Sequence, residues 1–166
     1  EAERIRQTAE LVHFQQMRRQ MLKELDQAEE EIDLLHCTLL LSKLDNPELD
    51  VGAYRRLMNQ MGQELRASLP KDVDDEKKLG LLNRFLFEEN GFHGSRNSDK
   101  GSRENSYMDH VLDNREGLPI TLSVVYVELA RRIGLTNVHG AQIPDHFMAC
   151  YLPAGKRGRL IDVYER

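Results

Sequence analysis

The sequence predicts an α+β protein with a helical first half and a mixed second half. Three observations support this prediction. No glycine or proline occurs before Pro47, and so long an uninterrupted stretch favours helix. The almost wholly apolar run from Pro119 to Ile133 is too long for a typical strand. Short apolar segments separated by prolines and glycines then follow to the end of the chain, a pattern typical of short strands.

The first half contains four segments with helical periodicity. Residues 1–31 carry apolar side chains at steps of three and four, which predicts one long amphipathic helix or two shorter ones. A coiled coil is the alternative for this segment, but polar residues interrupt a heptad seam at Gln15, Gln16, Arg18 and Arg19. A second, more buried helix is predicted over residues 32–44.

Two further helices follow the turn signal Asp45-Asn46-Pro47. The third is predicted from Val51 until Pro70 stops it. The fourth begins near Asp74, because carboxylates favour a helix N-terminus. It ends at Asn90-Gly91, which suits a left-handed cap.

The second half begins with an open segment. Residues 94–105 contain no apolar side chain, so an exposed, irregular and mobile loop is expected. An anion site formed by Arg96, Lys100 and Arg103 is the alternative. A short helix is expected over residues 107–112. The central helix then runs from Pro119 to Ile133 and stops at Gly134, and strands are predicted over residues 138–140, 146–152 and 160–163.

Composition limits the classes of function. The 166 residues carry a net charge of −5 and a pI near 5.7, which argues against nucleic acid as the partner. No stretch approaches the roughly 20 apolar residues of a membrane span. The two cysteines give no disulfide framework, and no secretory signal is visible, so a reducing cytoplasm is expected. Histidines and cysteines lack metal-ligand spacing, so neither a metal nor another cofactor is expected.

Several segments together resemble one known family. They read LLLSKLDNP (39–47), LLNRFLF (81–87), GFHG (91–94), NSY (105–107), VL (111–112), GLPITLSVVY (117–126), PDHF (144–147) and LID (160–162). These motifs resemble the transglutaminase-like superfamily, in the branch of bacterial proteins related to the SirB invasion regulators. A related domain occurs in a eukaryotic F-box protein. The resemblance implies a papain-type core in which a buried central helix packs on a short antiparallel sheet.

The resemblance also implies which residues correspond to the catalytic positions. Active members have Gly-x-Cys at the start of the central helix, then a His and an Asp on strands. Here Gly117 keeps the Gly, Pro119 takes the place of the Cys, and His146 and Asp162 match the His and the Asp. In such enzymes the helix N-terminus lowers the thiol pKa, the His accepts the proton and the Asp orients the imidazole. We therefore expect His146 and Asp162 to form a hydrogen bond, with Pro119 facing them but without a nucleophile.

Another side chain would have to replace the thiol if catalysis survives. Cys150 is four residues from His146, about 13 Å along a strand, and Cys37 lies among leucines of the helical half. Thr121 and Ser123 are better placed, in the first turns of the central helix. A hydroxyl there still needs close contact with the histidine.

Three hypotheses about function follow. The preferred one is a non-catalytic binding or regulatory module that uses the remnant cleft, or the helical face, for a protein or peptide. The others are a hydrolase or acyltransferase with Thr121 or Ser123 as nucleophile, and a structural domain of a larger protein. Division into a helical region (1–90) and a transglutaminase-like core (91–166), packed as one unit, is expected. Candidate binding residues are Arg103, Asn105, Ser106 and Tyr107.

Overall fold

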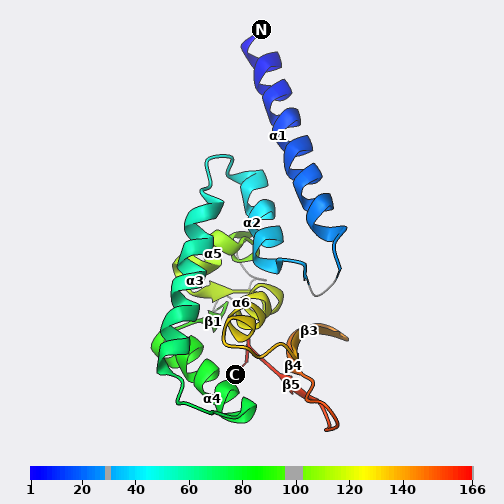
Figure 1. Cartoon of the computed structure of the whole chain (residues 1–166). Coiled ribbons are helices and arrows are strands. Elements are labelled where there is room, and N and C mark those ends of the chain that lie inside the picture. The colour runs from blue at the N-terminus through cyan, green and yellow to red at the C-terminus, as the bar shows by residue number, and fades with distance from the viewer. Residues whose placement is uncertain (29–30, 96–102, 166) are drawn as a thin grey trace.

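The computed structural model describes residues 1–28, 31–95 and 103–165. It confirms the α+β prediction: helices make up most of the described chain, and a small antiparallel sheet follows the central helix. Figure 1 shows the helices α2, α3, α4 and α6 gathered into one body, with the sheet on one side of it and α1 projecting away.

Helix α1 (Ala2–Leu25) is a single helix. Met17 is its buried residue, and His13 Nε2 lies 2.7 Å from the carbonyl oxygen of Lys43. These contacts fix the second half of α1 against α2 (Leu34–Asp45), whereas residues 1–12 are exposed. The first segment, predicted as one helix or two, is therefore a single helix, and only its second half packs on the rest of the protein.

Each of the next three helices begins at an aspartate, as the sequence predicted for one of them. The side chains of Asp33, Asp50 and Asp74 accept hydrogen bonds from backbone N–H groups in the first turns of α2, α3 (Val51–Ser68) and α4 (Asp75–Asn83). This satisfies donors that have no partner within the helix. Helix α4 continues into a π-helical turn, η2 (Arg84–Glu89). Gly91 has a φ of 68°, as the predicted left-handed cap requires.

Helix α6 (Pro119–Arg132) lies at the centre of the molecule. Its side chains on several faces are buried, including Leu122, Val125 and Leu129, which are 0% exposed. They belong to one hydrophobic core that includes Leu35 from α2 and Val163 near the end of the chain. An all-round apolar sequence therefore produces a helix that is covered by helices on one side and by the sheet on the other.

The sheet consists of β3 (Val138–Ile143), β4 (His146–Tyr151) and β5 (Arg159–Ile161), in that order. Both pairings are antiparallel, and Ile143 is opposite His146 in the first. The tight turn between β3 and β4 places Asp145 at a φ of 60°, a conformation that Asp adopts more readily than most residues. This turn sets the position of His146.

Two short strands were not predicted: β1 (His93–Gly94) and β2 (Glu116–Gly117), which pair in parallel. The predicted short helix, α5 (Met108–Asn114), lies between them in sequence. Most of the loop predicted over residues 94–105, including Arg96 and Lys100, lies outside the described residues. Its end forms a 3-10 turn, η3 (Arg103–Ser106), and Asn105 is only 6% exposed. The prediction of an irregular segment is therefore wrong at this end, and the predicted exposure is wrong for Asn105, whereas Arg103 and Glu104 are exposed.

Candidate functional site

The structure brings His146 and Asp162 together. His146 is the first residue of β4 and Asp162 follows β5 directly, so the antiparallel pairing of these strands places them side by side. His146 Nε2 lies 2.9 Å from Asp162 Oδ2. The other ring nitrogen, Nδ1, is not engaged by Asp162. The carboxylate thus fixes the orientation of the imidazole, which is its role in a catalytic triad.

Asp162 is stabilised as an anion. Burial acts to raise its pKa, but hydrogen bonds to the carboxylate outweigh this effect and hold the pKa below its usual value. Oδ1 accepts from the backbone N–H groups of Glu165 and Tyr164, both at 2.9 Å, and Oδ2 faces His146. The side chain therefore both closes the turn after β5 and orients the histidine.

Tyr164 packs beside this pair. Its ring meets the ring of His146 edge-on, with 6.4 Å between the centroids. Its hydroxyl donates to the carbonyl oxygen of Ser95 at 3.2 Å. The ring lies directly on Gly94, where an added Cβ would approach Tyr164 to 2.7 Å. Gly94 is therefore needed for this contact, which could not be predicted because no local pattern joins residues 94 and 164.

Pro119 begins α6, which packs against β4. Gly117 precedes it in β2, and a Cβ there would lie 2.8 Å from Thr121 Oγ1, which explains the glycine. Proline suits the first position of a helix because it has no N–H to leave unpaired. For the same reason Pro119 offers neither a nucleophile nor a backbone donor to a reacting carbonyl.

The two substitute nucleophiles are committed to the helix backbone. Thr121 Oγ1 accepts from the N–H of Leu118 at 2.9 Å and lies 3.1 Å from the carbonyl oxygen of Asn105. Ser123 Oγ donates to the carbonyl oxygen of Pro119 at 2.7 Å. Their exposures are 5% for Thr121 and 0% for Ser123. Both hydroxyls are therefore buried and hydrogen-bonded to backbone groups, which leaves them poorly placed to attack a substrate.

The candidate binding residues contact other parts of the chain. Arg103 forms an ion pair with Asp45 at 2.8 Å, and the hydroxyl of Tyr107 donates to the same carboxylate at 2.8 Å. Asn105 Nδ2 donates to Glu116 at 3.1 Å. Ser106 is exposed. Three of the four side chains thus hold η3 and α5 against α2 and β2.

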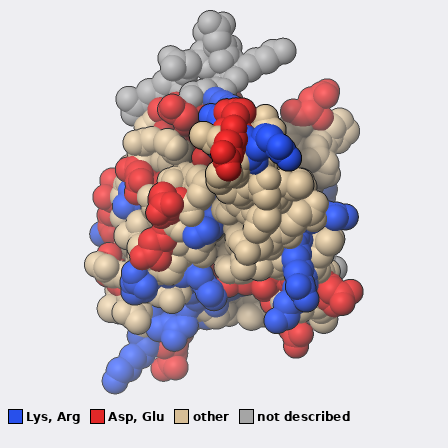
Figure 2. Space-filling view, turned by 90° about the horizontal axis from the view of Figure 1, so that it is seen from above, with Lys and Arg blue, Asp and Glu red and all other residues tan. Residues whose placement is uncertain are grey.

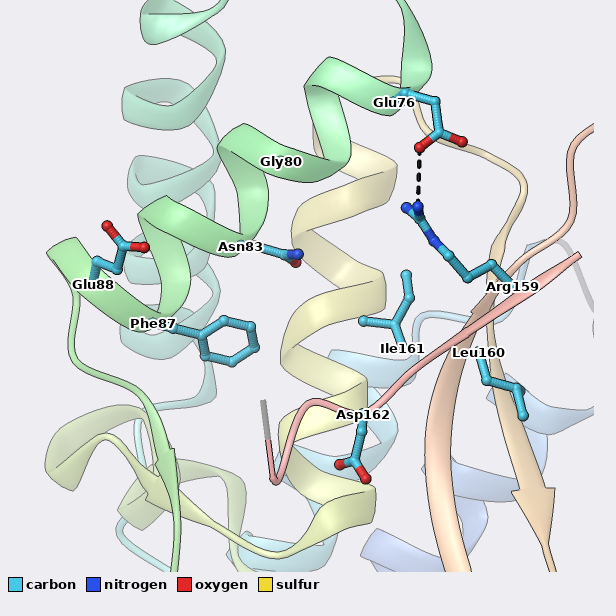
Figure 3. A pocket seen from close by; sticks show the side chains of 9 residues that line it. All are labelled: Glu76, Gly80, Asn83, Phe87, Glu88, Arg159, Leu160, Ile161 and Asp162. Carbon is cyan, nitrogen blue, oxygen red and sulfur yellow. Dashed lines mark ion pairs between the residues drawn. The ribbon is translucent and has the colours of Figure 1, made fainter.

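A groove runs beside Asp162, between α4 and β5 (Figure 3). It has a volume of about 670 Å³ and is open to solvent. We call it the β5 groove. Apart from Asp162 it was not predicted, because its walls come from distant parts of the chain. The residues that line it are Glu76, Gly80, Asn83, Phe87, Glu88, Arg159, Leu160, Ile161 and Asp162.

The walls of the β5 groove are linked to the core and to each other. Asn83 Oδ1 accepts a hydrogen bond of 2.7 Å from the hydroxyl of Tyr126, a buried residue of α6. Phe87 stacks on the same tyrosine ring, with centroids 6.4 Å apart. Across the groove, Arg159 pairs with Glu76 at 3.1 Å (Figure 3). The α4 wall is thus anchored to the central helix.

Other kinds of site find no support in the part of the chain that the structure describes. Its His, Cys, Asp and Glu side chains form no cluster of three that could hold a metal ion. Cys37 and Cys150 are buried free thiols, and burial raises the pKa of Cys37. None of the described helices is long and apolar enough to cross a membrane. On the face seen from above, basic and acidic side chains are interspersed (Figure 2).

A central helix packed on an antiparallel sheet, with a histidine of β4 paired with an aspartate directly after β5, is the arrangement that the resemblance to the transglutaminase-like superfamily implies. Comparison with protein families agrees with this assignment: the profile of the transglutaminase-like superfamily matches residues 52–166. The chain belongs to the transglutaminase-like superfamily.

Several curated proteins are similar to this chain. A protein named UPF0162 protein from Xylella fastidiosa (strain Temecula1) is 32% identical over 120 residues, which cover 72% of this chain and 42% of the relative. Its namesake in Vibrio cholerae is 26% identical over 137 residues, covering 82% and 50%. Human F-box only protein 21 is 31% identical over 87 residues, covering 52% and 13%. The chain thus spans half or less of the length of these relatives. No solved structure gives a significant match.

Proposed function

We propose that this chain is a non-catalytic transglutaminase-like module of the SirB-related branch, and that it binds a protein or peptide in the β5 groove. One observation carries this proposal. Asp162, which still orients His146, lines an open groove of about 670 Å³, whereas Pro119 stands at the position that the family resemblance assigns to the nucleophile. An oriented histidine beside an open groove, with no nucleophile at the position of the Cys, suits binding better than turnover.

The composition of the β5 groove also suits a polypeptide ligand. Phe87, Leu160 and Ile161 provide apolar surface, and Asn83 and the carboxylates provide polar groups. Binding sites commonly combine an apolar lining with a few placed polar groups. The groove is open rather than enclosed, so a segment of chain can lie along it.

A hydrolase or acyltransferase that uses Thr121 or Ser123 is the alternative. The buried hydrogen bonds of both hydroxyls count against it. A structural role within a larger protein is compatible with the relatives' greater length.

The test of the proposed function is peptide selection with a groove-filling variant. Gly80 lines the groove, and a Cβ there would meet no atom within 4 Å, so Gly80→Phe fills the groove without a clash at the backbone. Lys77→Phe places the same ring on the same helix outside the groove. We expect a displayed library of random dodecamers to yield peptides that bind the native chain and Lys77→Phe but lose binding at least tenfold on Gly80→Phe. Recovery of peptides that ignore Gly80→Phe, or turnover of amide or thioester substrates by the native chain, would count against the proposal.

A further inference from the structure

Strand β5 forms one edge of the sheet. The strand order is β3-β4-β5, so among the described residues β5 pairs with β4 alone. Its residues Arg159, Leu160 and Ile161 all line the β5 groove. The backbone N–H and C=O groups on the outer side of an edge strand have no strand partner and can pair with another extended chain. The groove therefore runs along a strand that can accept one.

The charge of the groove is one-sided. Three carboxylates line it, from Glu76, Glu88 and Asp162, against one guanidinium, from Arg159. Arg159 is paired with Glu76, and the Asp162 carboxylate is occupied by His146 and two backbone N–H groups. Glu88 is exposed at the opposite end of the groove from Glu76 (Figure 3). Of the three carboxylates it is the one without an ion-pair partner among the described residues, and Figure 3 shows it directed away from β5, so a long basic side chain must reach out from the strand to meet it.

The bridge between Arg159 and Glu76 does not close the groove against a ligand. The two side chains are 52% and 63% exposed, and exposed ion pairs contribute little to stability. Arg159 can therefore move aside at low cost when a chain enters along β5. Leu160, itself 51% exposed, offers apolar contact on that path.

We infer that the ligand of the β5 groove is an extended peptide segment that pairs with the free edge of β5 and places a lysine or arginine side chain beside Glu88. This inference rests on the proposed function and specifies the chemistry of its ligand. Main-chain hydrogen bonds to an edge strand provide affinity, and alternate side chains entering a pocket provide specificity. The excess of carboxylates selects a basic side chain at the entering position.

Two variants and one backbone modification test the inference on peptides recovered from the dodecamer library. Glu88→Gln removes the carboxylate in question. Glu89→Gln is the matched control, because Glu89 is adjacent, does not line the groove and pairs with Arg84. We expect the peptides sensitive to Gly80→Phe to be enriched in lysine and arginine. Their affinity should fall about two- to fivefold with Glu88→Gln, as for a partly exposed ion pair, and remain unchanged with Glu89→Gln.

Pairing with the strand edge is tested by N-methylation of alternate residues of a recovered peptide. Methyl groups on the edge facing β5 should weaken binding by up to about tenfold, because the three-residue strand offers at most two outward carbonyl groups to the N–H donors of the peptide. Methyl groups on the other edge should have little effect. If peptides sensitive to Gly80→Phe are acidic or neutral, or tolerate methylation on both edges, the inference is wrong and the proposed function stands. If no peptide is sensitive to Gly80→Phe, both are wrong.

Discussion

Replacing Gly80 by alanine is expected to stabilise the protein. Gly80 lies inside α4, and a Cβ at this position would meet no atom within 4 Å. Glycine inside a helix costs about 0.5–1 kcal/mol relative to alanine, because it loses more conformational entropy on folding. With no contact to offset this gain, Gly80→Ala should raise the free energy of unfolding by about 0.5–1 kcal/mol.

Gly62 provides the matched comparison. It is a buried glycine of α3, but a Cβ there would lie 2.7 Å from Cδ and 3.0 Å from Cβ of Arg132. Arg132 cannot withdraw freely, since its guanidinium is bonded to Glu128 at 2.5 Å and to Asn59 at 3.1 Å. Overpacking costs about 1–3 kcal/mol, so the same gain in helix propensity should be outweighed, leaving Gly62→Ala less stable by about 1 kcal/mol.

Urea and thermal unfolding followed by circular dichroism measure both effects, since the chain contains no tryptophan for fluorescence. For a domain of this size, a change of 1 kcal/mol shifts the melting temperature by about 2–4 °C. The two variants should move the transition in opposite directions. A shift of the same sign and size in both would refute the close approach of α3 to Arg132.

Three further predictions concern the site. Tyr126→Phe should lower the free energy of unfolding by about 1 kcal/mol in urea titrations, because Asn83 loses its donor but borders the open groove, where water can replace it; a loss above about 3 kcal/mol would contradict this. Because the folded pKa of Asp162 is lowered, its stabilising contribution is present above its unfolded pKa of about 3.9 and disappears as the pH falls through the folded pKa. Acid unfolding curves of the native chain and Asp162→Ala should therefore converge at low pH, and a constant difference would reject the assignment. Pro119→Cys should place a thiol of lowered pKa at the N-terminus of α6. Iodoacetamide should then label this thiol faster than an ordinary thiol near neutral pH, and the labelling should slow when His146→Ala is added. A labelling rate that does not depend on His146 would rule out a remnant cleft.

The central helix and the His–Asp pair could be predicted because their signals lie within short segments. Pro119 at the first helical position and Gly134 beyond the last fix the ends of α6, and its apolar composition fixes its burial. His146 and Asp162 occur at the ends of recognisable strands, and the family motifs supply their relation. Such features depend on local order rather than on how distant surfaces meet.

The β5 groove and the packing of Tyr164 beside His146 could not be predicted for the opposite reason. Gly80 and Leu160 come from segments with no shared periodicity. They meet at one groove because α4 packs on α6 and β5 pairs with β4, which itself packs on α6. The burial of Asn105 could not be predicted for the same reason. Its polar side chain predicted exposure, yet its amide donates a hydrogen bond to Glu116 and its carbonyl oxygen accepts one from Thr121, so these groups keep partners when buried.

The contacts of Tyr164 have a consequence for local unfolding. One residue joins three features: its ring contacts His146, its hydroxyl binds the backbone after β1, and its N–H binds Asp162. Lifting the turn after β5 would remove all of these contacts together. It would also withdraw the Asp162 carboxylate from His146, whose side chain is 24% exposed while the turn is closed. A cooperative opening of the turn therefore couples full exposure of the imidazole to the loss of its orientation.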